Sequence, residues 1–380
     1  MTNLNEKISR RKFLQLTAGA AIGAAMLNVP GMTFAAAAGA KVKAANYNKL
    51  PDAVPLAKDA ELVQLSYKKI QDAVSSIKDS TLRSMTAEII NNPNPAFMEN
   101  YQLLGSKRAL YNKLAAAGLL DTSKISAEQL LPPYSGKLPQ PFYSAPGSGY
   151  ASHHAYPGGL ATHTAANLCI SEGIYNTYKD IFNSDISRDI IISAQALHDL
   201  AKPLVFQWQK DQASLPEYTI AATGAHHILS IAEVIYRGFP VEEIVAQACA
   251  HTIPTGKDEQ VVAGYLKAAA IIAGKDAVKL GLVNSDNTIP TPHKQEGYIV
   301  SLGDHDFVLS SPACQKSVAI LKQIAAKDYG MTKAELEGEH FNRFRNYIGA
   351  QYSMMYIDSL ASTKNGMERI RQAVKNVIVK

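Results

Sequence analysis

Two stretches of the sequence indicate its architecture most directly: Gly158-Gly159-Leu160-Ala161-Thr162-His163-Thr164 and Ala196-Leu197-His198-Asp199-Leu200-Ala201-Lys202. Each sets a histidine within an apolar, helix-forming run. The 35 positions from His163 to His198 match the rest of one helix, a turn and a second helix. Because helices joined by short loops pack antiparallel, we expect His163, His198 and Asp199 to lie side by side.

Outside these stretches, helical patterns also dominate, and the sequence predicts an all-α fold. Residues 131–159, rich in Pro, Gly, Ser and Tyr, predict a long ordered loop, and residues 298–309 predict one small β-hairpin. The predicted helical runs are 60–90, 97–117, 159–178, 186–200, 225–236, 241–251, 259–280, 313–327 and 333 to the C-terminus.

Composition limits the class of protein. The 380 residues are 47% hydrophobic and 19% charged, enough to bury a sizeable core. The formal charge of +5 falls to about +2 beyond residue 40, which favours neither nucleic acid nor a membrane surface as partner. No apolar run of about 20 residues follows residue 40, so no stable membrane insertion is expected. The three cysteines show no CxxC spacing and are expected to be buried free thiols.

The N-terminus has the features of an export signal. Ser9-Arg10-Arg11-Lys12-Phe13-Leu14 precedes a weakly apolar stretch and a small-residue sequence that ends Ala38-Gly39-Ala40. This resembles a twin-arginine (Tat) signal peptide, which implies export of the folded protein by the Tat translocase to the periplasm or another extracytoplasmic space. The alternative is a basic tail. We therefore divide the chain into a signal peptide (1–40), an N-terminal helical region (41–135), a metal-binding domain (136–290) and a C-terminal helical extension (291–380).

Further histidines and acids recur on the helices that follow His198. His226 and His227 open one predicted helix, His251 closes the next, and Asp276 follows an alanine-rich run. Taken singly, such a histidine is more often a core or surface residue. Charged groups on apolar helix faces are costly unless paired or bound to metal, so several of them indicate a shared ion. Imidazole and carboxylate ligands suit Mn, Fe, Co or Zn, and the lack of cysteine ligands argues against a structural zinc site.

The order of these residues resembles the HD superfamily of metal-dependent phosphohydrolases. The resemblance covers roughly residues 150–282 and implies an HD-type helical bundle. It assigns the metal ligands to His163, His198, Asp199, His227 rather than His226, His251, and Asp276, with Asp304 as a weaker candidate for the last. Because Thr252-Ile253-Pro254 rather than a Gly-Tyr-Pro motif follows His251, the resemblance does not extend to the cyclic dinucleotide phosphodiesterases.

The resemblance also implies two divalent transition-metal ions bridged by Asp199. His163, His198 and Asp276 would complete one ion, and His227 and His251 the other. Lys202 takes the position of a phosphate-contacting lysine, although a solvated lysine at a helix end is an equal alternative.

The leading functional hypothesis is an exported hydrolase that cleaves a small phosphomonoester or phosphodiester through a metal-bound hydroxide. Asp199 and Lys202 are its expected catalytic residues. His153 and His154, on the loop before the first ligand, are expected to bind substrate, with a plain surface loop as the alternative. The second hypothesis is a di-iron oxygenase, because some HD relatives resemble oxygenases that use the same set of ligands. The third hypothesis is a non-catalytic metal- or ligand-binding protein.

Overall fold

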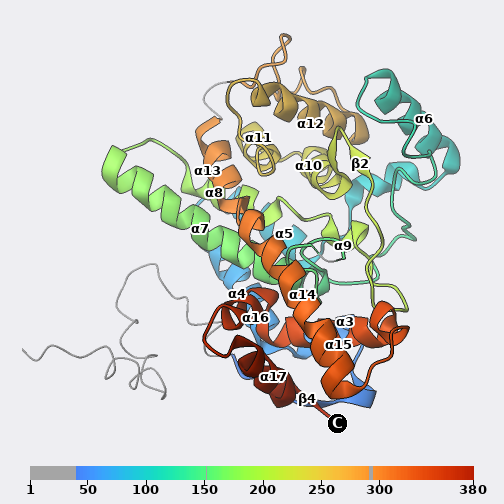
Figure 1. Ribbon diagram of the computed structural model, residues 1–380. Helices are drawn as coiled ribbons and strands as arrows, with labels where there is room; N and C mark the ends of the chain where they lie inside the picture. The colour runs from blue at the N-terminus through green and yellow to red at the C-terminus, as the bar shows by residue number, and fades with distance from the viewer. Residues whose placement is uncertain (1–39, 151, 291–293) are drawn as a thin grey trace, which may run out of the picture. The chain divides into compact units, whose positions relative to one another are not determined.

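Helices make up most of the chain that the structure describes. The computed structural model describes residues 40–150, 152–290 and 294–380, and residues 42–380 form one compact unit (Figure 1). The first helices are α3 (Ala53–Asp59), α4 (Glu61–Ser75), α5 (Ser80–Asn91), α6 (Leu104–Ala116), α7 (Gly159–Phe182), α8 (Arg188–Leu197) and α9 (Lys202–Val205). They are followed by α10 (Ala225–Arg237), α11 (Val241–Ala248), α12 (Asp258–Ile272), α13 (Lys294–Asp304), α14 (Phe307–Tyr329), α15 (Glu339–Tyr352), α16 (Met354–Ala361) and α17 (Gly366–Val377).

Strands among the described residues are very short. β1 (Ala45–Asn46) pairs in parallel with β4 (Ile378–Val379), and β2 (Thr219–Ile220) pairs antiparallel with β3 (Thr223–Gly224). The prediction of an all-α protein is therefore confirmed. The predicted loop from residue 131 to 159 is also confirmed, with a single 3₁₀ turn, η3 (Phe142–Ser144), inside it.

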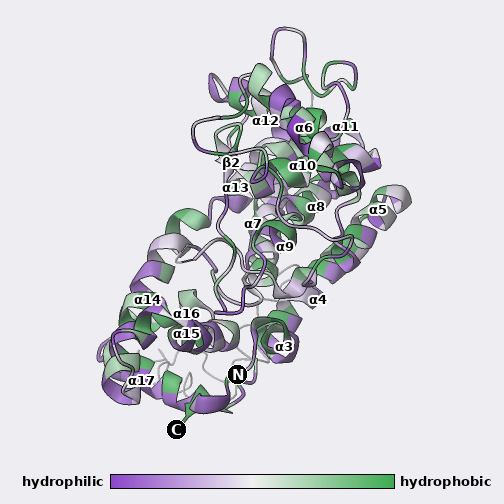
Figure 2. Cartoon of the chain, turned by 90° about the vertical axis from the view of Figure 1, so that its right-hand side faces the viewer, coloured by the Kyte–Doolittle hydropathy of each residue, from purple (hydrophilic) through white to green (hydrophobic). Residues whose placement is uncertain are grey.

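The amphipathic pattern of the sequence explains how the first helices pack. Leu62, Val63, Ile70 and Val74 of α4 are all buried, as their helical spacing predicts. The run over residues 60–90 is divided in two because the Asp79 carboxylate accepts hydrogen bonds from the backbone N–H groups of Thr81 and Leu82 and caps a new helix, α5. Hydrophobic and hydrophilic residues interleave along the helices (Figure 2).

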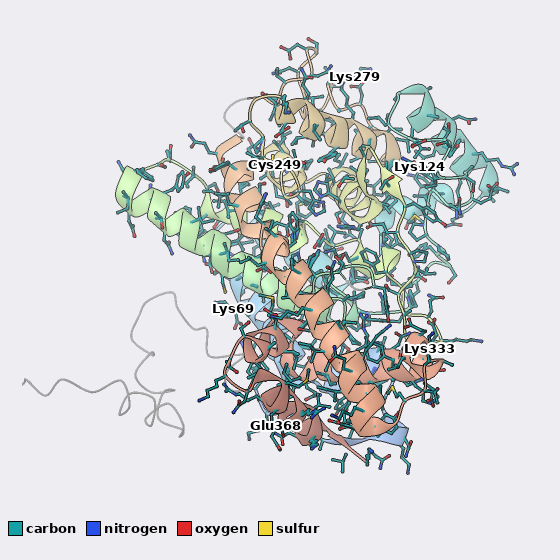
Figure 3. The ribbon with its side chains drawn as sticks, in the orientation of Figure 1. Lys69, Lys124, Cys249, Lys279, Lys333 and Glu368 are labelled. Carbon is teal, nitrogen blue, oxygen red and sulfur yellow. The ribbon has the colours of Figure 1, made fainter. Side chains whose placement is uncertain are left out.

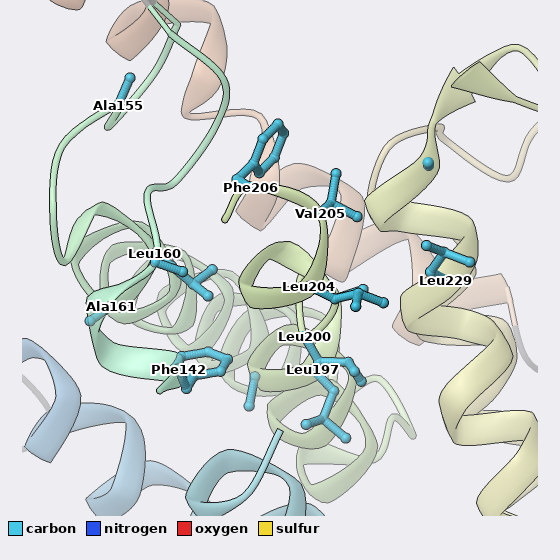
Figure 4. Close-up of a cluster of buried hydrophobic side chains, with 14 of the residues drawn as sticks. Phe142, Ala155, Leu160, Ala161, Leu197, Leu200, Leu204, Val205, Phe206 and Leu229 are labelled. Atoms are coloured by element: carbon cyan, nitrogen blue, oxygen red, sulfur yellow. The ribbon is translucent and has the colours of Figure 1, made fainter. Parts of the chain in front are cut away.

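The central helices α7, α8, α10, α11 and α13 form the frame of the site described below. α7 packs against α4, α8 and α13, while α11 packs against α8, α10 and α13. Leu197, Leu200 and Leu204, which flank the His198–Lys202 segment, are buried in the core near Leu160 and Leu229 (Figure 4). Each such leucine contributes roughly 1.5–3 kcal/mol by leaving water, so the short segment between α8 and α9 is firmly anchored.

The predicted hairpin over residues 298–309 is wrong, because this segment forms the end of α13 and the start of α14. Two glycines of this segment serve helix packing. A Cβ atom on Gly303 would lie 2.0 Å from the Ser171 hydroxyl of α7, and one on Gly297 would lie 2.6 Å from the Cys249 sulfur. Both glycines therefore allow α13 to approach its neighbours closely.

Lys124, Lys279, Lys333 and Glu368 are exposed and Lys69 is half-buried, whereas Cys249 is buried between helices (Figure 3). All three cysteines are free thiols; Cys249 and Cys314 are buried, and Cys169 is half-buried rather than buried as expected. None of the helices in the described part of the chain is both long and apolar enough to cross a membrane.

Two predictions stay open. The predicted signal peptide lies outside the described residues except for Ala40. The predicted domain limits at residues 135 and 290 remain predictions, and one hydrophobic core cluster runs from Leu50 to Ile378.

A buried glutamate between α8 and α11 makes the stability depend on pH. Glu243 is fully buried, and its carboxyl has one partner, the Ser193 hydroxyl at 3.1 Å, while Oε2 has none. Burial raises the pKa of Glu243 to about 8. The folded protein therefore keeps this proton at pH values at which the unfolded chain has released it, so this group lowers the free energy of unfolding as pH rises.

We expect Glu243→Gln to remove this penalty. Relative to the native protein, the variant should gain stability as pH rises from about 4.5 to 8, by at most about 1.4 kcal/mol per pH unit, with no further gain above pH 8. Urea denaturation at several pH values measures this difference. Glu242→Gln, at the exposed neighbouring position, is the control and should follow the native curve. Parallel curves for Glu243→Gln and the native protein would contradict the assignment.

Candidate metal centre

Two buried carboxylates, Asp199 and Asp304, lie at the centre of the site. Asp199 lies in the turn between α8 and α9, and Asp304 is the last residue of α13. The His163 Nε2 atom is 3.1 Å from both Asp199 Oδ2 and Asp304 Oδ1. The His198 Nε2 atom is 3.0 Å from the same Asp199 oxygen and 3.2 Å from the same Asp304 oxygen. Two imidazole nitrogens and two carboxylate oxygens thus converge.

A second group of imidazoles faces the other oxygens of the same carboxylates. The His226 Nε2 atom is 3.3 Å from Asp199 Oδ1. The His251 Nε2 atom is 3.8 Å from that oxygen and 3.5 Å from Asp304 Oδ2. Asp199 therefore belongs to both groups, as a residue that bridges two ions must.

Local sequence explains the position of Asp199. If α8 continued past His198, the Pro203 ring would clash with the carbonyl of Asp199 and break the helical hydrogen bond there. The chain instead makes a turn and starts the short helix α9 with Lys202 and Pro203. His198 and Asp199 consequently lie at the helix end rather than inside it, and both face the α7 histidine.

Neighbouring groups fix the orientation of the ligand side chains. His198 Nδ1 lies 2.8 Å from the Gln195 carbonyl, and His226 Nδ1 lies 2.5 Å from Glu217 Oε1. With Nδ1–H donated to these oxygens, each Nε2 is free to accept an ion, an arrangement typical of metal-binding histidines. Asn167 donates a hydrogen bond to Asp304 at 2.9 Å. Gly224 leaves room for Glu217, since a Cβ atom there would lie 2.8 Å from the Glu217 carboxylate.

The electrostatics of the cluster favour positive charge. Burial alone would lower the pKa of His198, but Asp199 and Asp304 outweigh it and raise this pKa to about 10. Burial likewise opposes the charge of His226, yet Glu217 and Asp199 raise its pKa to about 9. Burial would raise the pKa of Asp199, whereas His198 and Lys202 hold it well below its usual range. The carboxylates that favour the protonated forms of His198 and His226 would also stabilise a metal cation in the same place.

The residues present fit divalent transition metals. Both carboxylate oxygens of Asp199 and the Nε2 atom of His226 are buried and, within the described chain, make no hydrogen bond of regular geometry. A cation would satisfy all three atoms. His163, His198 and Asp199 form one group able to hold an ion, and Asp199, His226 and His251 form another. Four imidazoles and two carboxylates match the preferences of Mn, Fe, Co and Zn.

The structure corrects the choice between the two adjacent histidines. His227 does not face the carboxylates: its ring stacks on that of His251 with centroids 4.0 Å apart, and its Nε2 lies 3.1 Å from the Ala248 carbonyl. Successive residues of an α-helix point about 100° apart, so only one of the pair can face the cluster. That residue is His226, and His227 lies behind His251 and supports it.

The structure also corrects the predicted last ligand. α12 ends at Ile272, and Gly274, with φ +69°, lies in the left-handed region that terminates helices. Asp276 is therefore an exposed turn residue whose carboxylate caps the backbone N–H groups of Val278 and Lys279 at 2.9 and 3.0 Å. Lys279 lies at the periphery of the molecule (Figure 3). Asp304, the weaker candidate from the sequence, occupies the position expected of Asp276.

A cavity of about 290 Å³ opens over the cluster, and Lys202 and His153 line it. Lys202 is buried, and its Nζ contacts both the Asp199 carboxylate and the Gly147 carbonyl. His154 is not among the residues that line this cavity. Its Nε2 lies 3.2 Å from Asp306 and its Nδ1 3.1 Å from the Tyr156 hydroxyl, so both nitrogens are engaged within the protein.

Sequence reasoning missed Glu217, Asn167 and Asp306. Asn167 lies one helical turn after His163, a spacing that could have indicated it. Glu217 and Asp306 lie outside the helices, and no spacing rule connects them with the histidines they contact. The roles of the named residues as metal ligands, catalytic groups or substrate contacts remain predictions.

Comparison with known proteins identifies a partial similarity. The dihydroneopterin 2',3'-cyclic phosphate phosphodiesterase of Methanocaldococcus jannaschii is 31% identical over 99 residues, which are 26% of this chain and 39% of that protein. The chain thus spans about two fifths of the length of the curated relative it matches. No family model and no solved structure matches the chain.

We expect the metal content to distinguish the two aspartates. Asp304→Asn should lower the affinity for Mn²⁺ or Zn²⁺ strongly. Glu217→Gln leaves the proposed ligands in place but weakens the orientation of His226, so it should lower the same affinity by about 10–100-fold. Asp276→Asn should bind as the native protein does and serves as the control. Competition titration with a chelating dye measures all three. Loss of metal in Asp276→Asn, with no loss in Asp304→Asn, would show that Asp276 and not Asp304 is the ligand.

Proposed function

We propose that this protein is a metal-dependent phosphohydrolase that cleaves a phosphodiester bond in a small molecule. The observation that carries the proposal is a pair of buried carboxylates, each facing two groups of imidazoles, beneath an open cavity with a buried lysine in its wall. Such a ligand arrangement suits two ions held close together, as in many phosphoryl-transfer enzymes.

The sign of the charge in the cluster depends on the bound cations. When the imidazoles act as neutral metal ligands, Asp199 and Asp304 contribute two negative charges and Lys202 one positive charge, so these three side chains would not by themselves attract a phosphate. Two divalent ions would reverse this sign and attract an anion. When bound, such ions lower the pKa of a water molecule and neutralise the charge on the phosphoryl oxygens. The proposed ligands are His163, His198, Asp199 and Asp304 for one ion, and Asp199, His226 and His251 for the other.

Lys202 is the proposed phosphate-binding residue of the chain itself. Its Nζ is held between the Asp199 carboxylate and the Gly147 carbonyl, in the wall of the cavity. An ammonium group in a buried position strengthens the interaction with charge that develops on a phosphoryl oxygen. Its two anchors keep it next to Asp199, where it would contact a phosphate held by ions at the cluster.

The partial similarity to a cyclic phosphate phosphodiesterase favours a diester over a monoester. A 2',3'-cyclic phosphate is a compact diester whose phosphorus can reach a confined site. We therefore place cyclic phosphates first among the substrates to test, with open diesters and monoesters beside them.

The test uses the full chain stripped of metal by a chelator and reloaded separately with Mn²⁺, Fe²⁺, Co²⁺ or Zn²⁺. We expect hydrolysis of nucleoside 2',3'-cyclic phosphates or bis(p-nitrophenyl) phosphate to disappear on stripping and return on reloading. Lys202→Met should keep its metal and lose about 10²–10³-fold in kcat/KM. Lys210→Met, at an exposed position, is the matched control and should keep full activity.

Two outcomes would contradict the proposal. One is the absence of turnover of any phosphate ester by protein shown to hold metal. The other is oxygen consumption by the iron-loaded protein with no activity in the zinc-loaded form, which would identify the oxygenase that shares this ligand set.

We further propose that the protein is exported in folded form through the Tat pathway. The basis is the arginine pair and the weakly apolar stretch of residues 9–29. Replacing Arg10 and Arg11 by lysine should retain the protein in the cytoplasm of its own cells, as cell fractionation and immunoblotting would show. Unchanged export of this variant would rule the pathway out.

A further inference from the structure

One wall of the cavity differs in chemistry from the rest. Imidazole, carboxylate, ammonium and hydroxyl groups make up most of the described lining, and Phe307 is its one hydrocarbon ring. Phe307 begins α14 and is 37% exposed. Its ring centroid lies 6.4 Å from that of His153 and 5.6 Å from that of His305. An exposed phenyl ring among imidazoles beside a polar site suggests a surface on which a planar group can stack.

Two hydroxyl groups lie on the same wall. Ser311 follows Phe307 by one helical turn and so shares its face of α14. Its hydroxyl lies 3.5 Å from that of Ser152, the residue before His153. Ser152, Ser311 and Phe307 are partly exposed, whereas His163, His198 and Asp199 at the other end are buried. The ring and the hydroxyl pair therefore form the outer part of the cavity.

This wall is fixed in place before any ligand binds. His154 has a φ of 49°, a strained conformation for a residue with a side chain. Its backbone is enclosed by Gly147 and Gly159, and a Cβ atom on Gly159 would lie 1.7 Å from the His154 carbonyl oxygen. The His154 imidazole contacts Asp306, which immediately precedes Phe307. The loop residues Ser152 and His153 are thereby held against the start of α14.

The Nδ1 atom of His153 has no hydrogen-bond partner within the described protein. This atom is buried, although the residue lines the cavity. Leaving a buried polar nitrogen unsatisfied is unfavourable, so the arrangement favours a ligand that supplies the missing contact. His154, by contrast, is fully engaged and serves to position the loop.

We propose that Phe307, His153, Ser152 and Ser311 form a subsite for the non-reacting part of the substrate, and that this part is a planar heteroaromatic ring attached to a hydroxylated carbon unit. The ring stacks on Phe307, and the hydroxyl groups of the substrate exchange hydrogen bonds with the serines. A nucleoside is the simplest group of this kind. The inference rests on the proposed function, because it takes the phosphate to be held at the His/Asp cluster.

The test compares two diesters that share the same reacting group: adenosine 2',3'-cyclic phosphate and methyl riboside 2',3'-cyclic phosphate. We expect the native, metal-loaded protein to prefer the nucleoside by about 10–100-fold in kcat/KM, the range that stacking of one base provides. Phe307→Ala and Phe307→Leu should lose most of this preference, and Phe307→Trp should keep it, since planarity rather than apolar volume is required. Val308→Ala, at the exposed next position, is the control and should retain the preference.

A binding measurement keeps this inference separate from the proposed hydrolysis. Calorimetry on the metal-loaded protein should show adenosine 3'-phosphate binding more tightly than methyl riboside 3'-phosphate, and Phe307→Ala should bind the two almost equally. Equal binding of both by the native protein, or the same ratio in native protein and Phe307→Ala, would overturn the subsite whether or not turnover occurs. Absence of turnover together with the expected binding ratios would overturn the proposed hydrolysis alone.

Discussion

The structure of this protein depends on two carboxylates, Asp199 and Asp304, buried where neither can be solvated. Isolated, each would cost several kcal/mol, and the helices around them supply the groups that offset this cost. α7 contributes His163, the α8–α9 turn His198 and Lys202, α10 His226, and the segment after α11 His251. Asp199 faces both pairs of imidazoles, and Asp304 faces His163, His198 and His251, so five separate segments must meet within a few ångströms. The helices that form the bundle are therefore the same ones that carry the residues of the site.

Groups that contact the proposed ligands through hydrogen bonds fix the orientation of these side chains. The Gln195 carbonyl and the Glu217 carboxylate set which nitrogen of His198 and His226 faces the centre. Lys202 links Asp199 to Gly147, and His154 links the same loop to Asp306, two residues beyond Asp304. The loop that carries Ser152 and His153 is thus fastened on both sides to the neighbourhood of the carboxylates. This connection explains how the proposed substrate wall and the proposed metal centre, from distant parts of the sequence, keep one relative position.

Order and spacing in the sequence singled out His163, His198, Asp199 and His251, which the structure brings together in one cluster. The start of the helix at residue 225 was predicted correctly, but the resemblance favoured His227 over His226. Which of two adjacent residues faces the cluster depends on the rotation of the helix in the fold, which the sequence pattern does not give. Asp276 was preferred over Asp304 because residues 268–277 resemble the alanine-rich helix that bears the last ligand, whereas in the structure α12 ends at Ile272 and Gly274 lies in the left-handed region before Asp276 is reached. Glu217 and Asp306 depend on tertiary contacts, which local patterns do not encode. The all-α class, by contrast, follows from periodicity alone.

We propose that Asp199 bridges two ions held by imidazoles from successive helices. Anomalous diffraction from crystals of the metal-loaded full chain, measured at the absorption edge of the metal, can locate these ions. We expect two peaks, one enclosed by His163, His198, Asp199 and Asp304, the other by Asp199, His226 and His251. A single peak away from Asp199, or no peak in protein prepared with an excess of metal, would contradict this proposal.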